Sequence, residues 1–240
     1  MSYGENGNGG RDRYKLIKFP RSNSPLSRLS SPTMALIAIN AIVFIMLEVV
    51  GSSQNIDTLI TFGAKVNLFV RAGEWWRIFT AMFLHFGIFH ILVNSYSLYN
   101  LGSFSERVYG KWRFVAIYLT AGIAGNLLST ILGSLYSVGV GASGAVFGVA
   151  GSILYLGVRR PELFKYILGS SFVVSILLNL FIGFAIPGID VWAHIGGLLG
   201  GFAASWAIGT QADEMNGGPA WWKGAIVYGV LGLLLAYILS

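Results

Sequence analysis

Long apolar segments alternate with short polar segments from residue 34 to the end of the chain. A helix needs about 20 mostly apolar residues to cross a lipid bilayer. Seven segments come close to this length, and we expect one membrane-spanning helix in each: residues 34–50, 78–101, 114–132, 142–158, 166–186, 191–208 and 224–239. The pattern therefore predicts an all-α polytopic membrane protein with seven spans.

The residues before the first span are mainly polar. Residues 1–33 are rich in Gly, Ser, Asn and Arg and show no helical or strand period, so we expect a flexible cytoplasmic tail. A mitochondrial presequence is an alternative, but such presequences are amphipathic. The first apolar run begins too late for a usual signal-peptide core, which favours a retained span. We therefore expect a tail (1–33), a six-span core (34–209), and a linker with the seventh span (210–240).

The composition agrees with a membrane protein. Hydrophobic residues make up 55% of the chain and charged residues only 11%, whereas soluble domains have about 25% charged residues. The absence of cysteine excludes disulfides and cysteine-ligated metals. A net charge of +6 could indicate nucleic-acid binding, but basic loops on one side of a membrane explain it better. We expect the lipid bilayer as a partner and no nucleic acid.

The distribution of basic residues predicts the orientation. Cytoplasmic loops carry an excess of Lys and Arg. If the N-terminus lies inside, only Lys65, Arg71 and Arg77 of the 16 basic residues fall in outer segments. All seven tryptophans lie near predicted span ends, where an aromatic belt is expected. Both signals indicate an N-terminus inside and a C-terminus outside.

Several polar side chains lie within the predicted spans, where they are costly and therefore candidates for function. The second, fourth and sixth spans all run from outside to inside, which brings their polar residues to one depth near the outer face: His85, His90, Asn94, Ser143 and His194. His90 and Asn94 are four residues apart and share a helix face. His85 is rotated off that face, so we expect it to support the preceding loop.

Ser143 lies in the sequence VGVGASGAVFG (138–148), where a loop turns into an apolar helix. A serine becomes a strong nucleophile when a base takes its proton, and histidine is the usual base. Acyl transfer also needs donors for the developing oxyanion, which the Ser143 backbone, Asn94 and His90 could supply. These are the parts of a serine hydrolase without its carboxylate. Asp190 could complete a triad with His194, but its place before the sixth span favours a helix N-cap.

Glycines explain how the fourth and sixth spans could meet. Gly144 and Gly148 are four residues apart in the fourth span, and Gly197 and Gly201 are four apart in the sixth. Small residues at this spacing allow helix backbones to approach closely in lipid. We therefore expect these two spans to pack directly against each other, which would bring Ser143 to the histidine of the sixth span.

Each of these residues alone has a simpler explanation. A serine at a helix start is usually a cap, and an intramembrane histidine often has a structural role or belongs to an ion pathway. The joint arrangement favours hydrolysis. We expect no metal, because His85 and His90 lack the i, i+4 spacing of a zinc helix and no carboxylate accompanies them in the membrane.

Several motifs together resemble the rhomboid intramembrane serine proteases. GASG (141–144), AHIGGLLGG (193–201) and HFGIFHILVN (85–94) resemble the signature of this family. EWWR (74–77) and LGSFSERVYG (101–110) are similar to its first-loop and second-loop motifs. The resemblance covers about residues 34–208 and implies a six-helix rhomboid core followed by one extra C-terminal helix.

The resemblance also implies roles for individual residues. Ser143 would be the nucleophile and His194 its general base, in a dyad without a carboxylate. His90 and Asn94 would line the oxyanion hole. Phe147 would stack on the histidine, where the family often has a tyrosine, so a hydroxyl is missing here. Further residues would hold the first loop: Glu74, Trp76, Arg77 and His85.

The expected activity is cleavage of transmembrane segments of membrane proteins near the outer membrane face, through an acyl-enzyme and without a cofactor. The extra C-terminal span differs from mitochondrial members, which favours the plasma or inner cell membrane. An inactive relative that binds membrane clients is an alternative, disfavoured because Ser143 and His194 are both present. A transporter is less favoured because no inverted repeat is evident. The sequence does not indicate the oligomeric state.

Overall fold

A computed structural model describes residues 31–214 and 218–240. The predicted tail therefore lies outside the described residues, except for residues 31–33. The helices of the first half are α2 (Pro32–Val50), α3 (Ile56–Thr61), α4 (Asn67–Arg71), α5 (Arg77–Thr80), α6 (Gly87–Ser97), α7 (Ser103–Tyr109) and α8 (Lys111–Leu132). Those of the second half are α9 (Ser143–Arg159), α10 (Pro161–Ile167), α11 (Gly169–Ala185), α12 (Val191–Ile208), α13 (Gln211–Glu214) and α14 (Trp221–Leu239).

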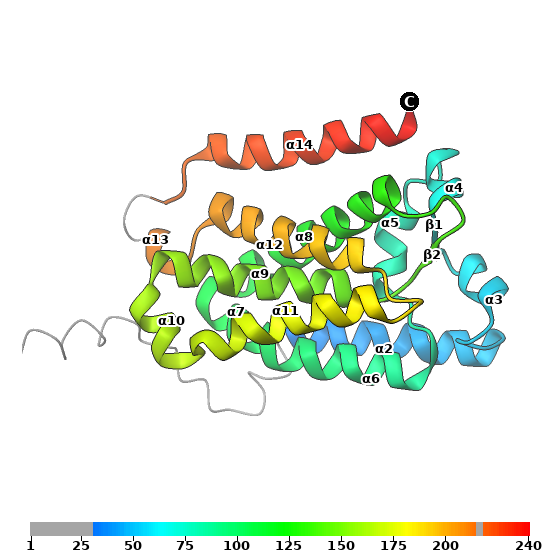
Figure 1. Ribbon diagram of the computed structural model, residues 1–240, viewed down its shortest axis with the longest axis horizontal. Coiled ribbons are helices and arrows are strands. Elements are labelled where there is room, and N and C mark those ends of the chain that lie inside the picture. The colour runs from blue at the N-terminus through cyan, green and yellow to red at the C-terminus, as the bar shows by residue number, and fades with distance from the viewer. Residues whose placement is uncertain (1–30, 215–217) are drawn as a thin grey trace, which may run out of the picture.

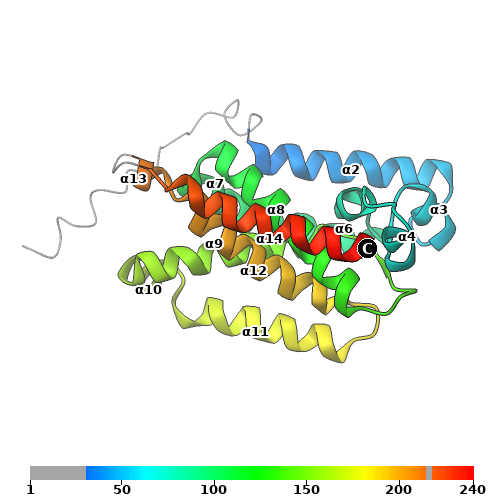
Figure 2. The ribbon, with the colours of Figure 1, turned by 90° about the horizontal axis from the view of Figure 1, so that it is seen from above.

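Helices α8, α9 and α12 form the centre of the fold and pack against one another (Figures 1 and 2). Their contact faces are made of small residues. A Cβ atom at Gly125 of α8 would lie 2.5 Å from the Ala193 carbonyl oxygen of α12. A Cβ at Gly151 of α9 would overlap the Leu198 carbonyl oxygen of α12. Glycine therefore allows backbone-to-backbone contact between the three helices, as the spacing of small residues predicts.

The outer helices α11 and α14 pack much more loosely. Only Ile176 and Gly183 are buried in α11, and only Val227 and Ile238 in α14. Helix α14 runs across α12 and α8 on one side of the molecule (Figures 1 and 2). Apolar side chains dominate both helices, so their exposed surfaces fit a lipid environment.

The helices agree in part with the seven predicted spans. Helices α2, α8, α12 and α14 are each long and apolar enough to cross a membrane. Helix α12 has the predicted bounds, 191–208. Helix α9 is apolar but only 17 residues long. Two further candidates are pairs of helices with a sharp bend, so the described helices support up to six spans by length and composition. The count of seven and the orientation stay predictions.

The second predicted span is wrong as a continuous helix. Residues Arg77–Phe83 form a short helix, in which α5 is followed by the 3₁₀ turn η2 (Ala81–Phe83). This short helix and the helix Gly87–Tyr109 point in directions that differ by 91°. The chain leaves the helical conformation at Leu84, where ψ is 146°, and Gly87 has a φ of +74°. His85 therefore lies in the break and not within a helix. The apolar sequence runs through this break, which hid it from the hydropathy pattern.

The fifth predicted span also begins too early. Residues Pro161–Ile167 form α10, which is bent by 79° from α11. Gly169, with a φ of +64°, begins the new direction. The helix of the second span extends past its predicted end at residue 101, because α6 continues into α7 through a π-helical turn, η3 (Leu98–Gly102).

Two short strands connect the first loop with the serine loop. Strand β1 (Lys65–Val66) pairs antiparallel with β2 (Val138–Gly139), and Lys65 lies opposite Gly139. The hydropathy pattern did not predict these strands, because two-residue strands have no detectable period. The pairing places the segment before α4 next to the loop before α9.

Candidate active site

Ser143 is the first residue of α9, and glycine shapes the loop that leads to it. Gly141 has a φ of +123°, a conformation that side-chain-bearing residues rarely adopt. A Cβ atom there would lie 2.8 Å from the His90 ring. The Gly141 N–H donates to the Ala81 carbonyl oxygen at 2.9 Å, which fixes the loop against η2. The first N–H groups of α9 have no partner within their own helix, so they are available to an anion.

His194 lies in the first turn of α12 and contacts Ser143 directly. Its Nε2 atom is 2.9 Å from Ser143 Oγ. The Phe147 ring stacks on the imidazole, with centroids 4.3 Å apart and planes 14° from parallel. Phe147 is one helical turn after Ser143, so both contacts to His194 come from one face of α9. The contact predicted from the glycine spacing is thus present.

The contact depends on close approach of α9 and α12. A Cβ atom on Gly197 would overlap the Gly144 carbonyl oxygen, and one on Gly201 would overlap the Gly148 carbonyl oxygen. All four predicted packing glycines therefore lie at the same interface, along two successive turns. Backbone contact sets the distance between the two helices and hence between their first residues.

Asp190 does not contact the imidazole. Its Oδ1 accepts the Ala193 N–H at 3.0 Å, which confirms the N-cap interpretation. His194 Nδ1 is buried and has no hydrogen-bond partner among the described residues. The structure therefore contradicts a triad, and the serine and histidine stand as a pair.

His90 projects from α6 towards the serine loop, where its ring lies beside Gly141. Its Nδ1 accepts the Phe86 N–H at 3.3 Å. A neutral imidazole that accepts at Nδ1 carries its proton on Nε2, so His90 can present a donor to the serine loop. Asn94, one turn further along, is buried, and its Nδ2 donates to the His90 carbonyl oxygen at 3.0 Å.

His85 contacts the serine loop, and its expected role in holding the first loop stays a prediction. It is fully buried, and its Nε2 accepts the Ala142 N–H at 3.5 Å. Its ring meets the His90 ring edge-on, with centroids 5.2 Å apart. In the described ranges 31–214 and 218–240, no three His, Asp or Glu side chains gather in a way that could hold a metal ion.

Arg77 holds the first loop together. Its Nε lies 2.6 Å from Glu74 Oε2, and its NH1 donates to the Ile60 and Ala64 carbonyl oxygens at 2.8 and 3.0 Å. Trp76 is 46% exposed, and its ring meets the neighbouring tryptophan edge-on. Glu74 and Arg77 thus occupy the loop position expected of them, while the Trp76 side chain faces outward.

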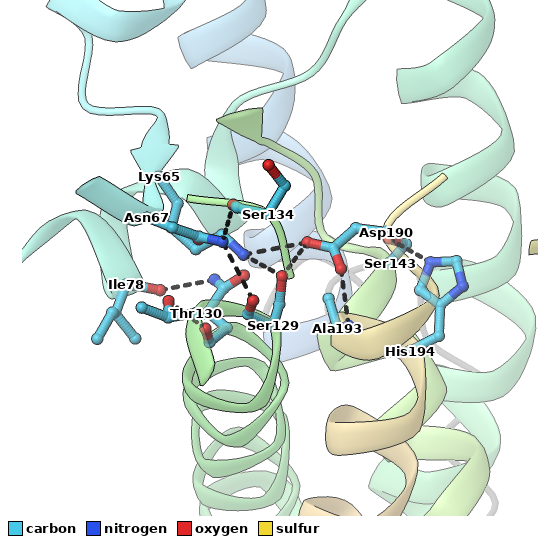
Figure 3. Close-up of polar contacts among 11 residues, drawn as sticks. Lys65, Asn67, Ile78, Ser129, Thr130, Ser134, Ser143, Asp190, Ala193 and His194 are labelled. Atoms are coloured by element: carbon cyan, nitrogen blue, oxygen red, sulfur yellow. Dashed lines mark hydrogen bonds and ion pairs between the residues drawn. The ribbon is translucent and has the colours of Figure 1, made fainter. Parts of the chain in front are cut away.

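A polar network that the sequence did not predict lies beside Ser143 and His194 (Figure 3). Lys65 is fully buried, and its Nζ lies 3.1 Å from Asp190 Oδ2 and also donates to the Ser129 hydroxyl. Ser129 donates to the same Oδ2 at 2.5 Å. A small pocket next to this network is lined by Asn126, Ser143 and Asp190, among others. A single lysine in a loop gives no sequence signal for such a contact.

The electrostatic state of Asp190 follows from its surroundings. Burial alone would raise the pKa of this carboxyl, but the Lys65 ammonium, the Ser129 hydroxyl and the Ala193 amide together hold the pKa below its usual range. Asp190 is therefore ionised near neutral pH and lies within ion-pair distance of Lys65, whose pKa is lowered by burial against the opposing effect of this carboxylate.

Comparison with known proteins gives the family. The rhomboid domain model matches residues 72–211. "Rhomboid protease GluP" of Bacillus subtilis is 44% identical over 177 residues, which cover 74% of this chain and 34% of that protein. "Rhomboid-like protease 2" of Toxoplasma gondii is 30% identical over 229 residues, or 90% of this chain and 78% of the relative.

A third relative, "RHOMBOID-like protein 6, mitochondrial" of Arabidopsis thaliana, is 38% identical over 147 residues, which cover 60% of this chain and 47% of that protein. The chain thus spans about a third of the Bacillus relative and about half of the Arabidopsis one. The family match, together with several long apolar helices, identifies an integral multi-pass membrane protein. The chain belongs to the rhomboid family.

Proposed function

We propose that this chain is a serine endopeptidase that cleaves transmembrane segments of membrane proteins, near the outer face of the plasma or inner cell membrane. The observation that carries the proposal is the 2.9 Å contact between His194 Nε2 and Ser143 Oγ, at the ends of two apolar helices. The names of the Bacillus and Toxoplasma relatives, which include the word protease, support it.

The proposed reaction uses the dyad twice. His194 Nε2 takes the Ser143 hydroxyl proton while Oγ attacks the scissile carbonyl carbon. The tetrahedral intermediate collapses to an acyl-enzyme, and the leaving amine receives the proton from His194. Water then attacks the acyl-enzyme, with the imidazole as base again. This sequence needs no cofactor.

The developing oxyanion needs hydrogen-bond donors that point at it from groups near Ser143. The backbone N–H at the start of α9 can supply one, aided by the positive end of the helix dipole. His90 Nε2–H and the Asn94 amide are our candidates for the others. The His90 ring already lies beside Gly141, so we assign it the larger share.

A substrate helix must unwind locally before cleavage, because its carbonyl groups are hydrogen-bonded within the helix. We therefore propose that substrates have segments of low helix stability near the scissile bond. The pocket that reaches Ser143 and Asp190 is our candidate for the position of the hydrolytic water.

A fluorophosphonate probe tests this function directly, because it reacts with activated serines. We expect the purified wild-type protein to be labelled, and both Ser143→Ala and His194→Ala to lose labelling. Ser175→Ala is a matched control, since this serine is exposed in α11 and bonds only to a carbonyl one turn earlier. Labelling that persists in Ser143→Ala would disprove the nucleophile assignment. A wild type that neither labels nor cleaves would favour the client-binding alternative.

Substitution of Phe147 is expected to affect the orientation of the histidine. The stacked pair has no hydroxyl bond to hold the ring, so Phe147→Leu removes the aromatic contact that aligns His194. Aromatic pairs contribute about 0.5–1.5 kcal/mol beyond their buried area, so we expect kcat to fall about twofold to tenfold. Steady-state cleavage of a single-span test substrate measures this effect. Phe147→Tyr keeps the stacking and should retain at least wild-type kcat; a loss as large as that of Phe147→Leu would contradict this role.

A further inference from the structure

Lys65 is a buried cation whose contacts converge on one carboxylate. Its side chain is fully buried, although it lies in the short two-residue strand β1. A buried ammonium needs charged or hydrogen-bonding partners, because removing it from water is costly. Asp190 Oδ2 lies 3.1 Å from its Nζ, and the Ser129 hydroxyl bonds both to that Nζ and to the same Oδ2. We call these three residues the Lys65 network.

The Lys65 network joins three elements that hold the dyad. Lys65 comes from β1, which pairs with β2, and β2 ends four residues before Ser143. Ser129 comes from the last turn of α8. Asp190 caps α12 through Oδ1, which accepts the Ala193 N–H. The two oxygens of the Asp190 carboxylate thus have different partners (Figure 3). Oδ2 bonds to Lys65 and Ser129, and Oδ1 accepts the N–H of Ala193 in the turn that carries His194.

The strand that leads to the serine also packs on the lysine. A Cβ atom at Gly139 would lie 2.7 Å from Lys65 Cε and 3.4 Å from Asp190 Oδ2. The lysine stem therefore fills the space directly beneath the β2 backbone. A change in the position of Lys65 would be transmitted both to β2 and to the cap of α12.

We propose that Lys65 is a positioning residue for the proposed reaction. It fixes the Asp190 carboxylate, and through that cap it fixes the first turn of α12 and the His194 ring relative to Ser143. The inference rests on the proposed function. Asparagine caps helices about as well as aspartate, so the charge of Asp190 is not needed for the cap alone. The pairing of Asp190 with Lys65 instead fixes the orientation of the carboxylate that caps α12.

Two substitutions separate positioning from capping. Lys65→Met removes the ammonium at nearly equal length, and Asp190→Asn keeps a capping oxygen but loses the charge. The readouts are the maximal rate of fluorophosphonate labelling at Ser143 and the probe concentration that gives half of that rate. We expect each variant to lower the maximal rate about tenfold or more, since small misplacements of catalytic groups are costly. The half-maximal concentration should stay within about twofold of wild type, because the probe-binding surface is unchanged.

The double variant tests whether both residues act through one contact. We expect Lys65→Met with Asp190→Asn to be no slower than the slower single variant, because coupled residues do not add. Arg71→Met is the matched control. Arg71 is an exposed cation at the end of α4, the helix that follows β1, and its NH2 donates to the Thr130 carbonyl oxygen at the same end of α8, not to α12. It should keep the wild-type rate.

The outcomes distinguish this role from the proposed function. Wild-type labelling rates in folded Lys65→Met and Asp190→Asn would overturn the positioning role, as would losses that multiply in the double variant. If Lys65→Met does not fold, Asp190→Asn decides the question alone, because it retains the cap. Absence of Ser143-dependent labelling in the wild type would instead overturn the proposed function.

Discussion

Replacing Ser143 by alanine is expected to lower the rate of peptide-bond cleavage by on the order of 10⁴-fold or more. In the proposed reaction this hydroxyl forms the acyl bond, and its Oγ lies 2.9 Å from His194 Nε2. The change removes one half-buried hydroxyl oxygen next to a pocket, so the fold should persist. Cleavage of a single-span substrate in reconstituted vesicles measures the loss, and circular dichroism checks the fold.

The matching His194→Ala variant and the double variant sharpen this prediction. Residues that act as one unit show strongly non-additive losses, so we expect the double variant to be about as slow as either single one. A double variant that is slower by the product of the two losses would mean that the two residues act independently. Ser175→Ala should retain wild-type cleavage, as its hydroxyl bonds only within α11.

Introducing a single methyl group at Gly197 is expected to have the next largest effect on cleavage, and to destabilise the fold as well. A Cβ at this position would overlap the Gly144 carbonyl oxygen, and backbone atoms cannot move aside as side chains can. Overpacking of this kind costs about 1–3 kcal/mol or more of unfolding free energy. If α9 and α12 separate by about 1 Å, cleavage should fall about 100-fold. Thermal unfolding and cleavage of Gly197→Ala measure the two effects.

Gly229→Ala is the matched control for this substitution. Gly229 lies in α14, and a Cβ there would meet no atom within 4 Å. Alanine has a higher helix propensity than glycine, so this variant should be as stable as wild type or slightly more stable. Equal unfolding temperatures for Gly197→Ala and Gly229→Ala would contradict the proposed role of the α9–α12 contact.

Much of the fold was predictable, because membrane spans need long apolar segments. The bounds of α12 were confirmed, and the glycine spacing predicted the helix contact that brings Ser143 to His194. Asp190 was confirmed as an N-cap, since a short acidic side chain before an apolar helix has that local role. These features depend on neighbours in sequence or on a repeated spacing.

The features that were missed depend on contacts between distant segments. The break near His85 lies within a continuous apolar run, and a hydropathy pattern does not report backbone direction. The partner of Lys65 is 125 residues away, and no period marks it. The contact of His85 with Ala142 likewise requires the loop geometry set by Gly141 and the β1–β2 pair.

The short length of α9 has a consequence for the lipid. Its 17 residues span about 25 Å at about 1.5 Å per residue, whereas the hydrocarbon core of a bilayer is about 30 Å thick. Arg159, at the opposite end from Ser143, forms an ion pair with Asp213, and charged groups favour the membrane–water interface. With that end anchored, the difference in length falls at the serine end. We therefore expect Ser143 to lie below that membrane surface, at a depth set by the length of α9, which α8 and α12 shield from the lipid.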